Sequence, residues 1–252
     1  MKYTLDTIPV LDAYKTGCEC PLCQLRVASE DSYVDSMLGA AYMEPDCRVR
    51  TNEVGFCTRH FQLMYDRRNR LGLALMTHTH MQEVISSVES ILKADEPARG
   101  GLLASLRGSR DEGGTPQKIR ARMSGCVICE QMEGAVNRYA YTIAQLYGTN
   151  SEFKAMFDAS KGFCLPHLAL VLEMAEKTLS GEALRTFRAA VSAVELPNLK
   201  RIEGELEWFT LKFDYRNTDK PWGNSRDAVE RAINKLMGAC VGPEAEMPAH
   251  ND

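Results

Sequence analysis

The sequence predicts an all-α protein in which two repeated helical metal-binding units are joined by a linker and followed by a helical C-terminal tail. Three observations predict this. Apolar residues recur every three or four positions through most of the 252 residues, as they do on one face of a helix. The period-two alternation of half-buried strands is nearly absent. A CxxC element followed by a GFCxxH element occurs twice, which indicates a duplicated unit.

The first repeated unit is expected to span residues 1–93. A helix follows the CPLC sequence, and Pro45 suits the first position of a short second helix. Apolar residues then follow a helical period over residues 58–92. We expect one strongly amphipathic helix there, kinked near Gly72.

The second repeated unit is expected to span residues 126–180, after a linker over residues 94–125. The linker is predicted from its proline and paired glycines among charged residues. The second unit repeats the helix order of the first, with helices expected over residues 127–147, 151–159 and 165–179.

A helical tail over residues 181–240 is expected to pack on the repeats. Its apolar pattern predicts one helix over 184–194, a second over 199–213 and a last one over 229–237. The second pattern forms a seam that favours burial within the chain, with a homo-oligomer through these C-terminal helices as the alternative. Residues 241–252 are predicted to be frayed.

Composition places the chain among ordinary globular proteins, with 44% hydrophobic and 25% charged residues. A net charge of −4, with both signs interspersed, argues against nucleic acid as the partner. No apolar run reaches 18 residues, and the N-terminus lacks a basic region followed by an apolar one, so we expect neither a membrane span nor a secretory signal. The prediction is a cytoplasmic protein with a protein partner.

The paired cysteine elements carry the chemistry. Between the second cysteine of CxxC and the cysteine of GFCxxH lie 33 residues in the first copy and 34 in the second. Each copy offers three thiolates and one imidazole, a common ligand set of structural zinc. We therefore predict one metal site in each copy. The first comprises Cys20, Cys23, Cys57 and His60, and the second comprises Cys126, Cys129, Cys164 and His167.

Both elements suit a metal site for physical reasons. A CxxC turn aims backbone amides at its sulfurs, which offsets their negative charge. In GFCxxH the glycine permits a left-handed entry, and the cysteine and histidine share one face of the following helix. Because four protein ligands leave no open position, the prediction is two structural zinc ions and no catalytic residue.

Alternatives to zinc remain open. An iron–sulfur cluster is also held by cysteines, and histidine can replace some of them, so an electron carrier or redox sensor is the main alternative. A redox dithiol in one copy is another, although the strand that precedes CxxC in thioredoxin-like folds is missing. A metal-dependent enzyme built on the first half is a third hypothesis.

Several residues lie outside the paired pattern. Cys18 has Ser124 as its counterpart, and we interpret Cys18 and Cys47 as unliganded accessory thiols, with a substitute ligand or a redox-sensing thiol as the alternative. His78 and His80 lie two residues apart and so do not share a helix face, which favours hydrogen-bonded boundary histidines. Cys240 is interpreted as structural or merely exposed. The aromatic residues from Trp208 to Trp222 are expected to lock the tail onto the repeats.

The chain resembles an uncharacterised family of bacterial cytoplasmic proteins of about this length. The resemblance rests on the opening DTIPVLDAYKTGCECPLCQL, the paired CPxC and GFCxxH elements, and the late KFDYRN followed by Trp222-Gly223. The second copy departs by having Val127-Ile128 where the first has Pro21-Leu22, which changes no ligand. The resemblance implies a helical metal-site protein of bacterial origin and supplies no established activity.

Our first functional hypothesis is therefore a noncatalytic, zinc-stabilised helical protein that acts as an interaction or regulatory module. An enzymatic role is the less favoured hypothesis.

Overall fold

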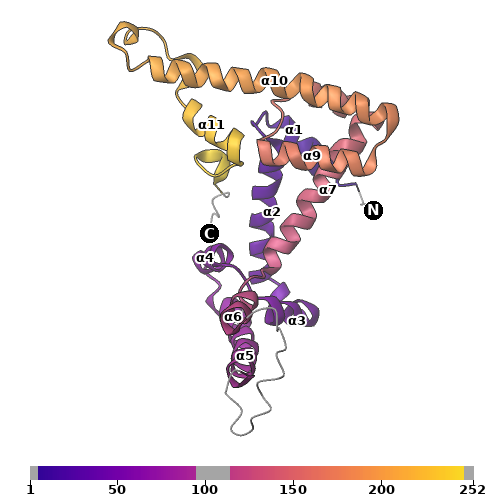
Figure 1. Cartoon of the computed structure of the whole chain (residues 1–252), viewed down its shortest axis with the longest axis vertical. Coiled ribbons are helices and arrows are strands. Elements are labelled where there is room, and N and C mark those ends of the chain that lie inside the picture. The colour runs from indigo at the N-terminus through magenta and orange to yellow at the C-terminus, as the bar shows by residue number, and fades with distance from the viewer. Residues whose placement is uncertain (1–4, 95–113, 247–252) are drawn as a thin grey trace, which may run out of the picture. The chain divides into compact units, whose positions relative to one another are not determined.

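The computed structural model describes residues 5–94 and 114–246, and these residues form helices and no strands (Figure 1). The predicted all-α class is thus confirmed. Contacts divide the chain into two compact units. Unit 1 contains residues 5–31 and 132–246 of the described chain, and unit 2 contains residues 32–94 and 114–131.

Two long helices belong to both units, because the boundaries at residues 31/32 and 131/132 fall inside α2 and α7. Unit 1 is consequently assembled from two separate stretches of chain. Its helices are α1 (Thr7–Lys15), the first part of α2 (Pro21–Leu38), most of α7 (Val127–Thr149), α8 (Ser151–Asp158), α9 (Leu165–Thr178), α10 (Gly181–Leu211) and α11 (Ala228–Met237). Short 3₁₀ turns follow at η3 (Tyr215–Asn217), η4 (Gly223–Ser225) and η5 (Pro243–Ala245).

An aromatic cluster forms the centre of unit 1. Phe157 lies in ring contact with Tyr147 at 5.1 Å and with Phe187 at 5.7 Å between centroids, and Phe153 meets Tyr14 at 4.9 Å. Phe153 and Phe157 are fully buried. Large buried rings dominate core energetics, so this cluster fixes α1, α7, α8 and α10 on one another.

Unit 2 contains η1 (Ala41–Met43), α3 (Pro45–Val54), α4 (Thr58–Asp66), α5 (Arg70–Ala94) and α6 (Thr115–Arg122). The α3 helix packs on α5, where Arg48 donates to the Leu75 carbonyl at 3.1 Å and to the Thr79 hydroxyl at 2.8 Å. Met64 and Met76 are fully buried. Unit 2 thus has its own small core.

The helix boundaries differ from the predicted ones in three places. The pattern over residues 58–92 is split into α4 and α5, because the Asn69 side chain accepts the Gly72 N–H at 2.9 Å and starts a new helix. The tail pattern forms one helix, α10, that continues through Pro197 where two were expected. Part of the predicted linker is α6, and the rest of it, residues 95–113, lies outside the described residues.

The boundaries of the two compact units differ from those of the two predicted repeats. The duplication itself stays a prediction. In the predicted frayed end, residues 241–246 are held in place: Asn234 donates to the Val241 carbonyl at 2.9 Å, and Glu244 accepts the Glu19 N–H at 3.2 Å. Residues 247–252 lie outside the described chain.

Candidate metal centres

The eight predicted ligands come together in two groups of four, each with three cysteines and one histidine. In each group the donor atoms lie within 4.8 Å of one another. Site A, in unit 1, consists of Cys20, Cys23, Cys164 and His167. Site B, in unit 2, consists of Cys57, His60, Cys126 and Cys129.

The predicted pairing of the elements was wrong. Each CxxC shares its site with the GFCxxH of the other copy, so site A uses the first and fourth elements and site B the second and third. The reason is that the first CxxC lies at the start of the long helix α2, which leads out of unit 1, so the GFCxxH of the same copy lies in unit 2 together with the other CxxC.

The donor atoms of site A have the separations of a tetrahedral zinc site. The Cys23 and Cys164 sulfurs lie 3.5 Å apart and those of Cys20 and Cys164 3.8 Å apart. His167 Nδ1 lies 3.5, 3.4 and 3.2 Å from the sulfurs of Cys20, Cys23 and Cys164. Zinc–sulfur bonds of about 2.3 Å in a tetrahedron require sulfur–sulfur edges of about 3.8 Å and sulfur–nitrogen edges of about 3.6 Å. The residues present therefore fit such an ion.

Site B has the same geometry. His60 Nδ1 lies 3.2 Å from the sulfurs of Cys57 and Cys126 and 3.4 Å from that of Cys129. The Cys57 and Cys129 sulfurs lie 3.8 Å apart. The sites differ in exposure, because the four ligands of site A are 0 to 9% exposed whereas Cys57 is half-buried and Cys129 is exposed.

Each GFCxxH element places its ligands on the first turn of a helix. Cys57 and Cys164 are the N-cap residues of α4 and α9, and the histidines follow three residues later. The preceding glycines are left-handed, with φ of +74° at Gly55 and +80° at Gly162. This conformation turns the chain into the helix at low cost only for glycine.

A polar side chain from a distant helix packs directly on each of these glycines. A Cβ at Gly162 would lie 2.3 Å from the Glu195 carboxylate, and one at Gly55 would lie 2.4 Å from the His80 ring. Glu195 accepts the Phe163 N–H at 2.8 Å, and His80 Nδ1 lies 2.8 Å from the Asn52 carbonyl. Glycine is therefore needed at both positions for the turn and also for the close approach of the Glu195 and His80 side chains.

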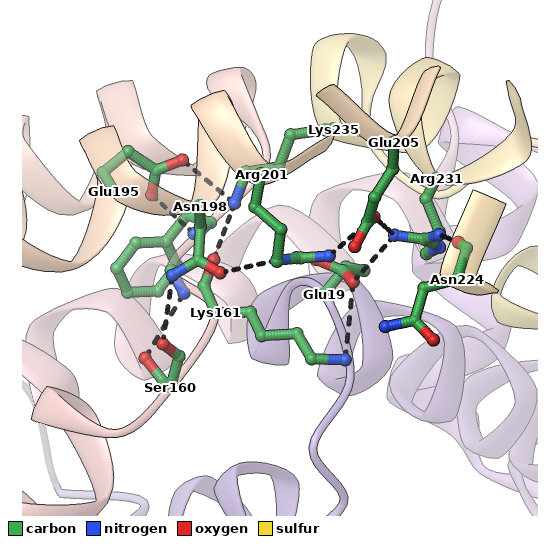
Figure 2. A network of polar contacts seen from close by, with 12 residues as sticks. Glu19, Ser160, Lys161, Glu195, Asn198, Arg201, Glu205, Asn224, Arg231 and Lys235 are labelled. Atoms are coloured by element: carbon green, nitrogen blue, oxygen red, sulfur yellow. Dashed lines mark hydrogen bonds and ion pairs between the residues drawn. The ribbon is translucent and has the colours of Figure 1, made fainter. Parts of the chain in front are cut away.

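A network of ion pairs holds both elements of site A from α10 and α11 (Figure 2). Glu19, which precedes the ligand Cys20, is buried and contacts Arg201 at 2.6 Å and Lys161 at 3.4 Å. On the other side, Lys235 contacts Glu195 at 3.0 Å and donates to the Lys161 carbonyl at 2.8 Å. Buried charges are tolerated when they are paired in this way, and breaking one pair is costly.

The segment after α11 completes the surroundings of site A. The Ala239 N–H donates to the Cys23 sulfur at 3.2 Å, next to Gly238 with φ of +89°. Asn234, which is buried, fixes this turn by accepting the N–H groups of Cys240 and Val241 at 3.0 and 3.1 Å. An N–H donated to a ligand sulfur offsets its negative charge and orients it.

At both sites burial and the neighbouring groups shift the thiol pKa values. At site A, burial and the neighbouring thiols raise the pKa of Cys20 well above its ordinary value. At site B, burial and hydrogen bonding to Cys126 raise the pKa of Cys129 to about 12. For Cys126, burial acts upward, but the His60 hydrogen bond and two backbone N–H groups lower the pKa to about 6. A bound divalent ion stabilises all three thiolates, and its uptake releases protons.

The residues outside the paired pattern are not part of either ligand group. Cys18 borders a cavity of about 540 Å³ beside site A, together with Cys20 and Cys23, and burial raises its pKa. The Cys47 thiol points to the Met37 sulfur at 3.7 Å. His78 is exposed, and His80 is the hydrogen-bonded boundary histidine that was predicted.

The tail aromatics pack on one another. Phe209 and Trp222 lie 5.7 Å apart between centroids, and the Trp208 indole N–H donates to the Pro221 carbonyl at 3.0 Å. They fold residues 212–222 back on the end of α10.

Comparison with known proteins gives a family without an activity. The model of a family of unknown function, DUF6062, matches residues 1–243. The chain belongs to this family. This confirms the expected membership of an uncharacterised family. No curated protein and no solved structure matches the DUF6062 chain. None of the helices in the described residues combines the length and apolarity needed to cross a membrane.

Sequence reasoning missed the residues that support the ligands. Glu195 had a usable signal, since it directly follows the helix predicted over 184–194 and lies four residues after Val191, on the continuation of the apolar face, where unpaired charges are rare. Glu19, Asn234 and Lys235 had none, because their partners are distant in sequence.

Proposed function

We propose that this DUF6062 protein is a noncatalytic helical protein that binds two zinc ions and acts as an interaction or regulatory module in the bacterial cytoplasm. The observation that carries the proposal is the geometry of the two ligand groups. Each supplies three sulfurs and one imidazole nitrogen within 4.8 Å, with separations close to the edges of a zinc tetrahedron. Zinc bound there would hold helix starts together and would perform no step of chemistry.

The ligand spacing favours a single ion over an iron–sulfur cluster. In a cluster the cysteines bind different irons and lie on opposite sides of the sulfide-bridged core, so at least some ligand atoms must be far apart. All four donor atoms of either group lie within 4.8 Å. Three thiolates and one imidazole around one ion form a common structural zinc set.

The closed ligand set favours a structural role over an enzymatic one. With four protein ligands, zinc has no free position for water or substrate. The enzyme hypothesis relied on a metal held by the first half alone, whereas each ligand group draws on both halves of the chain. Because each ligand group combines the CxxC of one copy with the GFCxxH of the other, the ions would link distant parts of the chain. Site A joins the two stretches of chain that make unit 1, through Cys23 and Cys164.

The stabilisation expected from the ions is large. A structural zinc ion contributes an apparent 10 kcal/mol or so when the site forms only on folding, which is comparable to the whole stability of an ordinary domain, about 5–15 kcal/mol. We propose that the availability of zinc controls whether the protein is folded and able to bind its protein partner.

The first experiment is elemental analysis with an absorption spectrum, on protein purified without oxygen and without added metal. We expect two zinc per chain and no visible absorption. Iron with matching sulfide and a broad band near 400 nm (about the region of cluster charge transfer) would replace zinc with a redox role. Protein that is folded without any metal would overturn the proposal altogether.

A further inference from the structure

Two of the three thiols of site B are open to solvent, in contrast to those of site A. Cys129 is exposed and Cys57 is half-buried. In site A, even the two cysteines that border the cavity, Cys20 and Cys23, are only 4 and 6% exposed. Because the oxidation of a thiolate requires access to its sulfur, a small oxidant can reach site B without any opening of the fold.

The two accessible sulfurs of site B face each other across the site. The Sγ atoms of Cys57 and Cys129 lie 3.8 Å apart. Cys57 is the N-cap of α4 and Cys129 lies in the first turn of α7, so the pair connects the two stretches of chain that make unit 2. The sulfurs of a disulfide are about 2 Å apart, so a movement of less than about 2 Å would close one here.

Contacts that do not involve a metal hold these two helix starts together. The Val127 N–H donates to the Gly55 carbonyl at 3.1 Å. Arg122 donates to the Glu53 carbonyl at 2.7 Å across the same junction. The two accessible thiols therefore stay opposite each other when an ion leaves, and this proximity favours closure of a disulfide over separation of the helices.

We propose that site B is a redox switch, in which a peroxide oxidises Cys129, Cys57 closes a disulfide with it, and zinc is released from this site alone. The inference rests on the proposed function, because it requires zinc at site B. A disulfide would leave Cys126 and His60 as protein ligands, fewer than the four that hold a structural zinc ion. The switch specifies the regulatory role, since it makes the metal content of unit 2 depend on the presence of peroxide.

The chemistry balances with hydrogen peroxide as the only oxidant. The Cys129 thiolate attacks one oxygen of the peroxide, so that an S–O bond forms, the O–O bond breaks, and the hydroxide that leaves takes a proton from solvent. The Cys57 thiolate then attacks the sulfur of this sulfenic acid. An S–S bond forms, the S–O bond breaks, and a second hydroxide leaves and is protonated. Two thiolates have then lost two electrons, and one peroxide with two protons has become two molecules of water.

The test is a titration of the zinc-loaded full chain with hydrogen peroxide. Zinc release is followed with a zinc-sensitive dye, and disulfides are located by mass spectrometry of peptides. At about one peroxide per chain, we expect release of one zinc equivalent, a disulfide that links Cys57 to Cys129, and retention of the second equivalent. A phosphine reductant with added zinc should restore both equivalents, because the disulfide is accessible at the surface.

Two variants test which thiol is attacked. Cys129→His keeps a four-ligand zinc set of two thiolates and two imidazoles, so it should bind two ions and release neither at one peroxide per chain. Cys240→Ser is the matched control, since it removes the other exposed cysteine, which is not a ligand, and should release zinc as the wild-type chain does. The wild-type disulfide map decides the question even if Cys129→His binds less zinc.

The outcomes separate this inference from the proposed function. A chain isolated with no zinc at site B would contradict the proposed function itself. A chain that holds two ions and releases both together, or neither, would overturn the redox switch alone. A disulfide that leaves out Cys57 or Cys129 would also overturn it, because a different pair of thiols would then be the reactive one.

Discussion

Sites A and B each contain three cysteines and one histidine, yet their surroundings differ. In site A every ligand is buried, a backbone N–H from Ala239 reaches the Cys23 sulfur, and buried ion pairs hold both cysteine elements. In site B Cys129 is exposed, and the contact of His80 with the Asn52 carbonyl supports the turn. We therefore expect zinc to exchange more slowly at site A than at site B, although the ligand types are identical.

The largest effect is expected from testing which CxxC element shares a metal site with which GFCxxH element. The double variant Cys20→Ser with His167→Ala damages site A alone and should retain one zinc per chain. Cys20→Ser with His60→Ala damages both sites and should retain none. Pairing within each copy predicts the opposite result for the two variants. Zinc analysis after gel filtration decides between them, with the single variants as controls for one lost equivalent.

The rate of metal loss should distinguish the two sites next. Site B is expected to release zinc to a chelator at least tenfold faster than site A, because attack on a ligand sulfur requires access and Cys129 provides it. Release followed by a zinc-sensitive dye should be biphasic, one equivalent in each phase. The Cys20→Ser with His167→Ala variant should show the fast phase alone. A single phase for the wild-type chain would mean that burial does not control release.

Loop length does not explain such a difference. Site A closes the chain between residues 23 and 164, and site B between residues 60 and 126, so the loops differ about twofold. Each doubling of loop length changes the closure free energy by only about 0.6 kcal/mol. The expected difference in zinc release between the two sites is therefore due to burial, backbone donors and supporting charges.

Substitutions at Gly162 and Gly55 test how strongly Glu195 and His80 support the two turns. Gly162→Ala should destabilise the protein by about 3 kcal/mol, since it combines left-handed strain with a clash against Glu195, which Lys235 and the Phe163 N–H hold in place. Gly55→Ala should cost about 1–2 kcal/mol, because the His80 side chain can rotate away.

Urea unfolding of the zinc-loaded variants measures both values. Equal losses would indicate that the left-handed backbone alone sets the cost and that the two supports are equivalent.

Sequence patterns were sufficient for the helices and the ligand types, and insufficient for the pairing. Pro45 located the start of α3, and the apolar period over residues 229–237 located α11 closely. All eight ligands followed from residue type and spacing, since a CxxC or GFCxxH element is local chemistry. The gaps of 33 and 34 residues fit either pairing, so they identify the duplication and not the partner. The tertiary fold decides that, because α2 and α7 each run from one unit into the other.

The split at Asn69 and the supports of site A illustrate a second limit. Asn69 ends an apolar pattern that would otherwise continue, because one side-chain hydrogen bond to Gly72 competes with a helical period of over thirty residues. Lys235 sits among the apolar residues of α11 and is nevertheless buried, paired with Glu195 from α10. Such pairs depend on tertiary contacts that no local pattern encodes.

The smallest expected effect concerns the turn that covers site A. Asn234→Ala removes the acceptor of two backbone N–H groups and the donor to the Val241 carbonyl, which should cost about 1–2 kcal/mol. With the turn loosened, the Ala239 N–H would no longer be held on the Cys23 sulfur. We therefore expect zinc release from site A to accelerate several-fold towards that of site B, while the fast phase stays unchanged. Asn52→Ala in unit 2 is the matched control and should leave the slow phase unaltered. If Asn234→Ala lowered stability without changing the slow phase, the Ala239 contact would be structural only, and burial alone would account for the inertness of site A.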